Sequence, residues 1–445
     1  MINRLSVTQK LVLSFVFVII VGSILLSLPI SHYANSPETS YLDHLFNTVS
    51  MVCVTGLSVV PVSKAYNGLG QILSMLLMQT GGLGLVSLIA FSTYTLKNKL
   101  GLSDQDLLQS ALSRDNQKDL KAYLFKVYKI TFSIEALAAL VIMTDFIPRF
   151  GLGHGIFNSL FLAVSAFCNA GFDLFGVSLI NYQSDWIVLS TIMLLIIFGG
   201  LGFVVWSDFF DHGLKFKKYE LHSKIVLVFN GIIILVPAIF YFIFEFTNFG
   251  NAGKFTHLPF NEKILNALFL SVSPRTAGFN SLDLNNLTSS GKLLTMILMF
   301  IGGSTGSTAG GVKVTTIVVV IANLVSLARG KDKIVLFKRR VNNNIVKQSS
   351  ALVLAYLIIT IISTLVICAI EPNVMFESVL FEVISGIDTV GLSLGLSSYA
   401  CVATKLILTF LMYVGRLGAF SLFDLLLKKS ENIYLEKPEG KVLVG

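Results

Sequence analysis

The sequence predicts an all-α membrane protein made of four repeated units around a central pore. Each unit has a helix, a re-entrant half-helix with its loop, and a second helix. Three observations lead to this prediction. Hydrophobic residues make up 54% of the 445 residues and charged residues only 13%, whereas soluble proteins have about 25% charged residues. Long apolar runs follow one another along the chain, and a short motif occurs four times, at intervals of a little over a hundred residues.

Eight apolar runs are long enough to cross a hydrocarbon core of roughly 30 Å. They cover residues 11–30, 69–92, 123–145, 186–209, 224–246, 293–328, 350–370 and 404–427. The first run exceeds the apolar part of a signal peptide, and no A-x-A type of cleavage site follows it. The sequence therefore predicts eight transmembrane helices in a multi-pass protein of the cell membrane, surrounded by lipid.

Basic residues are concentrated in alternate connections between these runs, and Lys and Arg are retained on the cytoplasmic side of membrane proteins. Five lie from Lys97 to Lys121, four from Lys215 to Lys224, seven from Arg329 to Lys347, and four from Lys428 to Lys441. The other connections contain only Lys64, Arg149, Lys254, Lys263, Arg275, Lys292 and Lys405. We therefore expect both termini on the cytoplasmic side.

The composition also argues against other classes of function. The net charge of +8 follows from this topology, and no basic block lies in a soluble domain that would bind nucleic acid. The cysteines form no C-x-x-C pair and show no metal-ligand spacing with the six histidines, so we interpret them as small apolar side chains. They are Cys53, Cys168, Cys368 and Cys401. No nucleophile, metal cluster or acid/base pair stands out, so the sequence predicts neither an enzyme nor an organic cofactor.

The repeated motif is L-F-x-x-[VI]-S followed by a glycine and then Leu or Phe. Its four copies are "DHLFNTVSMVCVTGL" (43–57), "NSLFLAVSAFCNAGF" (158–172), "NALFLSVSPRTAGF" (266–279) and "SVLFEVISGIDTVGL" (378–392). The serines are Ser50, Ser165, Ser273 and Ser385. The glycines Gly56, Gly171, Gly278 and Gly391 lie six, six, five and six residues later. Four ordinary extracellular turns would not explain so specific a shared pattern.

Each copy has a residue with a capping side chain seven residues before its serine, and we expect a short helix to begin there. These residues are Asp43, Asn158, Asn266 and Ser378. The eight residues from cap to serine span about 12 Å, which is less than half a bilayer. Such a helix enters the membrane without crossing it. The residues after the serine return as irregular backbone, which is tolerated at that depth only inside protein or beside water.

This arrangement favours a cation. Half-helices that descend from outside direct their C-terminal ends, each with about half a negative charge, toward the membrane centre. Four loops in a ring can replace the water shell of an alkali ion with backbone carbonyls, and glycine suits such loops because it has no Cβ. The predicted ion-binding residues are Val54, Thr55, Gly56, Asn169, Ala170, Gly171, Thr276, Ala277, Gly278, Thr389, Val390 and Gly391. In the third copy we expect Pro274 to end the half-helix and Arg275 to brace the loop from behind.

These residues resemble the superfamily of potassium transporters that includes the Trk, Ktr and plant HKT proteins. The segments "TGL", "NAGF", "RTAGF" and "TVGL" carry the resemblance, which extends over essentially the whole chain. The chain is most similar to the Ktr-type membrane subunit, because it begins at the first repeat, lacks the extra helices of Trk subunits and ends in a short "EKPEGKVLVG" tail. The resemblance implies four units with one filter glycine each. It also implies a homodimer with one pore per subunit, and a cytoplasmic ring of nucleotide-binding regulatory subunits of the KtrA type.

The units predicted along the chain are residues 1–97, 98–212, 213–330 and 331–445, the last with the C-terminal tail. Their second helices carry glycine clusters at 81–84, 199–202, 302–306 and 415–418. For the first two clusters, close helix packing through small residues is the favoured interpretation. A dinucleotide site does not fit, because each cluster lies inside a membrane span with no strand before it.

The third cluster is different because ten consecutive small residues are a poor helix. They are Gly302, Gly303, Ser304, Thr305, Gly306, Ser307, Thr308, Ala309, Gly310 and Gly311. A P-loop does not fit, because Val312 stands where the lysine should be. Packing through the GxxxG spacing of Gly302, Gly306 and Gly310 remains an alternative. We predict instead an irregular, hydroxyl-rich loop in the pore, and the resemblance implies that it is a gate.

Three charged residues also lie in or beside the predicted spans. Arg416 is too deep in the last helix to snorkel, so we expect it to face the bundle interior. It either forms a structural ion pair or lies beneath the filter, where it pairs with the gate loop and opposes cations. Asp388 either raises the cation concentration at the outer mouth or is a solvated loop carboxylate. Glu135, deep in the third span, needs a partner that the sequence does not identify.

The sequence therefore predicts uptake of potassium ions across the plasma membrane. Potassium is the expected transported ion, and sodium is the second candidate ion. Two alternatives remain open: a sodium-translocating protein of the same architecture, and a non-transporting membrane scaffold. In the family, serine at the first filter position accompanies sodium preference, so Gly56 implies potassium. A scaffold would not need four matched re-entrant loops.

Overall fold

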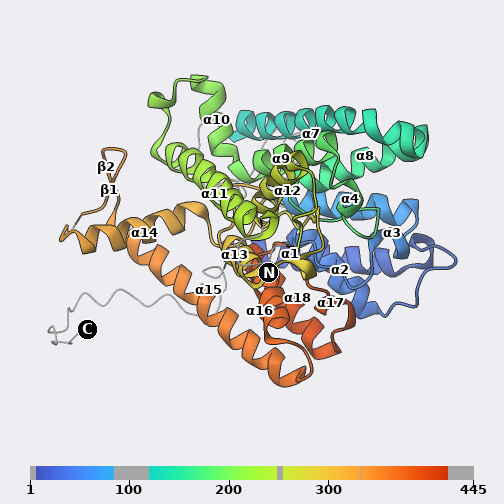
Figure 1. Ribbon diagram of the computed structural model, residues 1–445. Helices are drawn as coiled ribbons and strands as arrows, with labels where there is room; N and C mark the ends of the chain where they lie inside the picture. Colours follow the sequence, from blue (N-terminus) through green and yellow to red (C-terminus); the bar gives the residue numbers. More distant parts are fainter. Residues whose placement is uncertain (1–6, 85–119, 248–253, 332, 419–445) are drawn as a thin grey trace.

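The computed structural model describes residues 7–84, 120–247, 254–331 and 333–418, and these residues are predominantly helical (Figure 1). The segment with the first copy of the motif contains α1 (Val7–Ser27), η2 (Pro29–Ser31), α2 (Tyr41–Cys53), α3 (Val62–Ala65) and α4 (Gly68–Leu83). The second contains α7 (Leu120–Phe150), α8 (Leu152–Phe167), η3 (Ile180–Tyr182), α9 (Trp186–Leu201) and α10 (Phe203–His212). The third contains η4 (Phe216–Lys218), α11 (Leu221–Phe246), α12 (Phe260–Val272), η6 (Leu284–Asn286), α13 (Ser289–Phe300) and α14 (Val314–Ala328). The fourth contains β1 (Val335–Leu336), β2 (Arg339–Arg340), α15 (Asn343–Ile370), α16 (Phe376–Ile387), α17 (Leu396–Tyr399) and α18 (Val402–Leu417).

Three described helices are long and apolar enough to cross a membrane, namely α7, α11 and α15. The run 186–209 does not form one straight helix. The chain bends by 92° between α9 and α10, at Gly202, whose φ of +89° ends the helix. The run 293–328 is interrupted between α13 and α14 by the small-residue segment. The later parts of the runs 69–92 and 404–427 lie outside the described residues, as do the boundary at 97/98 and the tail after 418.

The four helices that carry the motif, α2, α8, α12 and α16, begin earlier than expected. The N-cap of α2 is Ser40, and Asp43 is its third residue, which completes a capping box with Ser40. Asn158, Asn266 and Ser378 lie inside their helices, which begin directly after Gly151, Pro259 and Met375. The predicted N-caps are therefore wrong. The helices have 13, 16, 13 and 12 residues. At 1.5 Å per residue they span about 18–24 Å, which is still less than the hydrocarbon core.

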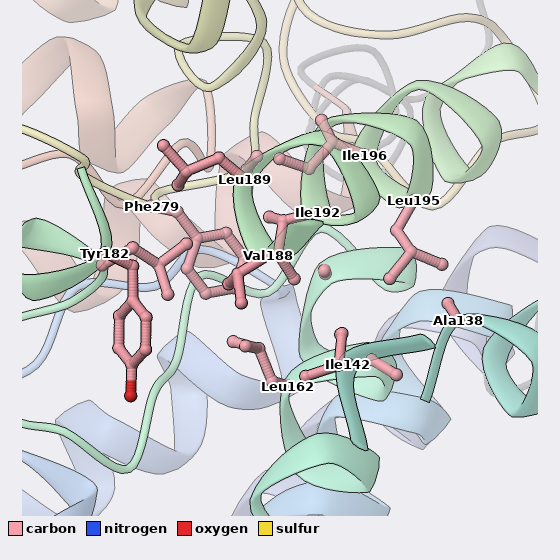
Figure 2. Packing of buried hydrophobic residues seen from close by; sticks show 14 of the residues in the cluster. Ala138, Ile142, Leu162, Tyr182, Val188, Leu189, Ile192, Leu195, Ile196 and Phe279 are labelled. Carbon is pink, nitrogen blue, oxygen red and sulfur yellow. The ribbon is translucent and has the colours of Figure 1, made fainter. Parts of the chain in front are cut away.

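Each motif helix packs against its neighbours through a largely apolar face. Figure 2 shows the cluster around the second copy, where Leu162 of α8 faces Ile142 of α7 and Val188 of α9. Phe279, from the loop of the third copy, enters the same cluster. The second and third copies are thus joined by one continuous apolar core.

The first and last copies also meet. One buried cluster contains Phe46 of α2 together with Val383 of α16 and Leu408 of α18. Lys405 Nζ lies 2.8 Å from Asp43 Oδ1, an ion pair between residues 362 positions apart. The two ends of the fold are therefore brought together, and α14, α15 and the β1–β2 hairpin extend from one side of the molecule (Figure 1).

The glycine clusters at 81–84 and 199–202 lie against the ends of the motif helices. A methyl group on Gly82 would lie 2.7 Å from Cys168 Sγ, and one on Gly81 would overlap the carbonyl of Val52. Gly199 likewise faces the carbonyl of Phe167. The packing interpretation of these two clusters is confirmed, because any larger residue would push the second helices away from the half-helix ends.

Candidate ion-binding site

All four motif helices end in the same kind of turn. The residue two positions before each motif glycine has a positive φ. These residues are Val54 (58°), Asn169 (58°), Thr276 (64°) and Thr389 (51°). Left-handed backbone is unfavourable for residues with a Cβ, on the order of 1–3 kcal/mol each, and the strain is largest for a β-branched residue such as Val54. Four equivalent strained residues indicate a conformation that the rest of the fold enforces.

Hydrogen bonds explain the spacing of the motif. Thr55 N–H donates to Ser50 O, and Ala170 N–H and Val390 N–H donate to the carbonyls of Ser165 and Ser385, all at 2.8 Å. These bonds reach back five residues, as in a Schellman ending. In the third copy the bond from Ala277 N–H to Ser273 O, at 3.1 Å, reaches back only four residues. This shorter turn is why its glycine comes five rather than six residues after the serine.

The motif serines hold the chain that leaves each turn, a role that the sequence did not reveal. Ser50 Oγ and Ser385 Oγ accept from the N–H groups of Gly56 and Gly391, both at 3.0 Å. Ser165 Oγ accepts from Phe172 N–H at 2.9 Å. In the third copy Ser273 Oγ donates to the carbonyl of Phe279. A serine that recurs with a glycine at fixed spacing was the available signal.

The four motif glycines come together, and we call them the glycine ring. A methyl group on Gly56 would lie 3.1 Å from Gly391 Cα and 3.3 Å from Gly171 Cα. One on Gly278 would lie 3.2 Å from Gly171 Cα and 3.3 Å from Gly391 Cα. The order around the ring therefore follows the order of the copies. All four have a positive φ of between 72° and 101°, so glycine is required here for both conformation and space.

The carbonyl preceding each ring glycine lies against the next glycine around the ring. A methyl group on Gly56, Gly171 or Gly278 would lie 2.7–2.9 Å from the carbonyl oxygen of Ala170, Ala277 or Val390 respectively, and Gly391 faces the carbonyl of Thr55. No described residue donates a hydrogen bond to any of these four oxygens. Three nearby buried side-chain oxygens also have no partner among the described residues, Thr55 Oγ1, Asn169 Oδ1 and Thr389 Oγ1. Because buried carbonyls are nearly always paired, this oxygen-rich ring is suited to bind a cation.

The two sides of the ring differ. On the side of the residues that follow the glycines, a cavity of about 290 Å³ is lined by the ring glycines together with Ser58, Asp173, Asn280 and Ser393. On the side of the helix ends lies the small-residue segment 302–311, which we call the small-residue loop. A methyl group on Gly310 would overlap Thr389 Oγ1.

The small-residue loop is hydrogen-bonded to the ends of two other helices, α9 and α8. Ser304 N–H and Thr308 N–H donate to the carbonyls of Gly200 and Gly199, at 3.0 and 3.3 Å. Thr308 Oγ1 donates to Phe167 O at 3.2 Å, at the end of α8. The segment is not helical, so its glycines do not form a regular GxxxG packing face, and the packing alternative is wrong for this cluster.

Arg416 of α18 holds the loop from the opposite side. Its Nη1 donates to Thr308 O at 2.5 Å, and its Nη2 donates to the carbonyl of Gly81. No carboxylate of the described residues forms an ion pair with Arg416, so the expectation of a structural ion pair is wrong. A second cation, Lys313, was not singled out from the sequence. Its Nζ donates to Ala309 O at 2.7 Å and to Gly310 O at 3.3 Å.

Asp388 does not lie at the outer mouth, and neither sequence interpretation of it is correct. It is fully buried as the C-cap residue of α16, and its Oδ1 accepts from Val312 N–H at 3.3 Å. The carboxylate therefore faces the small-residue loop, on the side of the helix ends. Helix α16 continues to Ile387, so Asp388 lies at the end of the helix and not in the loop that follows Gly391.

Two other buried charges have identifiable partners. Glu135 accepts from Gln79 Nε2 of α4 at 3.1 and 3.3 Å through its two oxygens. Arg275 donates to Asn230 Oδ1 of α11 and so braces the third loop from behind, as expected. Helix α12 ends at Val272 with Ser273 as its C-cap, directly before Pro274.

Comparison with known proteins decides the family. The family model described as "TrkH: Cation transport protein" matches residues 7–433. The chain belongs to this family. It is a multi-pass membrane protein and a cation transporter, not an enzyme.

Among curated proteins, this TrkH-family chain is 35% identical to the potassium/sodium uptake protein NtpJ of Enterococcus hirae, over 100% of the chain and 98% of that protein. It is 34% identical to the Ktr system potassium uptake protein B of Bacillus subtilis, over 99% of the chain and 97% of that protein. The same-named protein of Vibrio alginolyticus is 35% identical over 98% of the chain and 94% of its own length. The crystal structure of the potassium transporter TrkH from Vibrio parahaemolyticus is similar in fold, with a TM-score of 0.74 at 18% identity, over 95% of this chain and 86% of that one.

Proposed function

We propose that this protein takes up potassium ions across the plasma membrane through the glycine ring. The observation that carries the proposal is the set of four buried carbonyl oxygens, from Thr55, Ala170, Ala277 and Val390, that encircle the ring without hydrogen-bond donors among the described residues. Backbone carbonyls arranged around an axis replace the hydration shell of an alkali ion. The selectivity filter is then formed by residues 54–56, 169–171, 276–278 and 389–391.

The geometry supports a pathway with an outer and an inner side. The half-helices end at the ring, so their C-terminal partial charges favour a cation there. In the proposed architecture, four units (1–97, 98–212, 213–330 and 331–445) surround the ring with eight transmembrane helices, and both termini are cytoplasmic. The cavity of about 290 Å³ is then the outer vestibule, and the small-residue loop lies just inside the filter.

The small-residue loop and Arg416 form the proposed gate. The loop fills the space beside the helix ends and is tied to them by hydrogen bonds from Thr308 and to α18 by Arg416. Arg416 and Lys313 place two positive charges on the inner side of the ring, and such charges oppose a passing cation. Conduction therefore requires the loop to move.

The relatives from Bacillus subtilis and Vibrio alginolyticus are named as Ktr system proteins, which supports assembly with other subunits. We propose a homodimer in the lipid bilayer, bound on its cytoplasmic side by a ring of nucleotide-binding regulatory subunits.

Sodium is the second candidate ion, because the relative from Enterococcus hirae is named a potassium/sodium uptake protein. Glycine at position 56, rather than serine, supports potassium as the main ion.

The test is ion flux in liposomes that contain only this chain, under potassium and sodium gradients applied separately. Faster potassium flux supports the proposal, and faster sodium flux supports the second candidate. Liposomes with correctly folded protein and no flux of either ion would support a non-transporting scaffold. Gly278→Asp is the control, because a side chain at this position enters the ring.

A further inference from the structure

The third residue before each motif serine differs between the copies in a pattern that the sequence alone does not explain. It is Asn47 in the first copy, Leu162 in the second, Leu270 in the third and Glu382 in the fourth. All four side chains are buried. Two copies thus place a polar side chain where the other two place leucine.

In the first copy Asn47 clamps the chain that leaves the glycine ring. Its Oδ1 accepts from Val59 N–H, and its Nδ2 donates to Val60 O, both at 3.0 Å. The amide therefore satisfies a donor and an acceptor on the backbone three and four residues beyond Gly56.

In the fourth copy the carboxylate of Glu382 holds the chain that leaves the glycine ring. Its Oε1 accepts from Ser393 Oγ and from Ser397 N–H, both at 3.0 Å, and from Ser397 Oγ. Ser393 lies two residues beyond Gly391 and lines the outer cavity. Glu382 Oε2 is buried and has no hydrogen-bond partner among the described residues. All the hydrogen bonds that Glu382 accepts from described residues are therefore directed at the departing chain.

The second and third copies are held by each other instead. Leu179 N–H donates to Asn280 O, and Asn280 N–H donates to Ser178 Oγ, both at 2.9 Å. Asn280 lies two residues beyond Gly278. Because these two hydrogen bonds already hold the departing chains, the second and third copies need no polar side chain at this motif position. Leu162 instead packs into the apolar cluster with Phe279 (Figure 2).

We propose that Asn47 and Glu382 are positioning residues that set the geometry of the glycine ring in the first and fourth copies and so determine its ion selectivity. This inference rests on the proposed function of the ring. The physical reason is that Gly56 and Gly391 are neighbours in the ring, and no backbone hydrogen bond between the described residues ties their departing chains to each other. Without the clamps, the carbonyls of Thr55 and Val390 have freedom to shift, and a ring that adapts its size discriminates less between ions of different radius.

The test measures potassium and sodium flux in liposomes for Asn47→Leu and Glu382→Leu, which introduce the residue used by the other two copies. We expect each to lower the potassium-to-sodium flux ratio by about tenfold, the scale of one or two lost hydrogen bonds, while the protein stays folded. Leu162→Met and Leu270→Met are matched controls at the same motif position and should leave the ratio unchanged. Glu382→Gln keeps an oxygen acceptor and should preserve the ratio and its pH profile.

A second measurement does not depend on flux. In a Cys401→Ser background, a cysteine introduced at Ser58 lies in the outer cavity, directly before the clamped Val59. Its labelling rate should rise severalfold when Asn47→Leu is added, because the segment is released. If the leucine variants fail to fold, Asn47→Asp and Ser393→Ala are measured in their place, because each removes only part of a clamp.

The outcomes are distinct. If the wild-type protein carries no ion flux, the proposed function is wrong. The labelling rates then test by themselves whether Asn47 holds the departing chain. Normal flux with an unchanged ratio in both leucine variants, or an unchanged labelling rate, overturns the inference. A pH profile that changes in Glu382→Gln would show that the charge of Glu382 acts directly on the ion and would overturn the positioning role.

Discussion

Arg416 Nη1 lies 2.5 Å from the carbonyl oxygen of Thr308, so the last helix of the described chain holds the middle of a loop 108 residues earlier. The same guanidinium donates to the carbonyl of Gly81, at the end of α4. One side chain therefore joins the first and last copies to the small-residue loop. Its fork of donors suits this bridging role, which a lysine with a single nitrogen cannot reproduce.

Removal of residues 304–308 should increase potassium flux while the protein stays folded. The deletion takes away the part of the loop beside the helix ends and leaves the ring carbonyls in place. Steady potassium flux in liposomes, normalised to correctly folded protein, measures the effect. Flux that falls while the fold is retained would contradict a gate.

Arg416→Met should act in the same direction as the deletion, because it removes both a positive charge near the pathway and the anchor of Thr308. The two changes should be non-additive when combined, since they loosen one element. Arg416→Lys is the matched control. It keeps the charge, so a flux between those of the wild type and Arg416→Met would separate the charge from the hydrogen bonds.

Gly278→Asp should abolish potassium uptake without preventing membrane insertion. The new Cβ would lie 2.7 Å from the carbonyl oxygen of Val390 and 3.2 Å from Gly171 Cα, and φ at this position is +76°. The carbonyl ring must then distort. Uptake by cells and the amount of protein in the membrane fraction are measured together. Normal uptake by both Gly278→Asp and Gly171→Asp would remove these loops from the pathway.

Gly56→Ser should have a milder effect and shift preference toward sodium. A Cβ at Gly56 would lie 2.9 Å from the carbonyl oxygen of Ala170 and 3.1 Å from Gly391 Cα, and the φ of +101° strains any side chain. The effect is milder than that of aspartate because serine is smaller and carries no charge. Competition between potassium and sodium in the liposome assay measures the shift. An unchanged preference would show that this glycine does not determine the choice of ion.

Cysteines introduced at Lys64 and Lys254 should react with impermeant thiol reagents from outside the cell, and those at Lys218 and Lys338 only after permeabilisation. All four positions are exposed in the structure, so burial does not mask the result. The expectation follows from the distribution of basic residues. Labelling of Lys338→Cys from outside intact cells is the result that excludes the four-unit topology.

The Lys405–Asp43 ion pair should stabilise the contact between the first and last copies. Burial tends to raise the pKa of Asp43, but hydrogen bonds from Lys405 and Ser40 and the charge of Lys405 outweigh it, so the pKa is lowered. A lowered pKa means that the stabilisation is present above the pKa of the unfolded chain, about 3.9, and is lost as the pH falls through the lower folded value. Lys405→Met should therefore lower the unfolding temperature in detergent at neutral pH, by the equivalent of about 1 kcal/mol. The difference from wild type should shrink near pH 4 and below; a difference that is independent of pH would show that packing, not charge, is responsible.

Much of the secondary structure of this protein could be predicted from sequence features that act over a few residues. Apolar runs indicate helices because the hydrocarbon core excludes charged residues, and the recurrence of Ser and Gly at fixed spacing indicates one backbone turn used four times. The one-residue difference in the third copy was visible as well, and the structure explains it by the shorter hydrogen-bonded turn at Ser273. The ten small residues from 302 to 311 indicated a break because such residues are poor helix formers.

Only the tertiary structure decided the relationships between residues far apart in the chain. The motif helices begin before the residues with capping side chains, because helix continues wherever packing favours it. Helix α16 also continues at its other end to Ile387, and this places Asp388 beside the small-residue loop. The partners of Glu135 and Arg416 come from segments more than fifty residues away in the chain. Asn47 and Glu382 are visible in the sequence, but their hydrogen bonds to the departing loops depend on how each loop folds back over its half-helix. Periodicity and capping act over a few residues, whereas these contacts depend on how the four motif helices and their loops pack around the glycine ring.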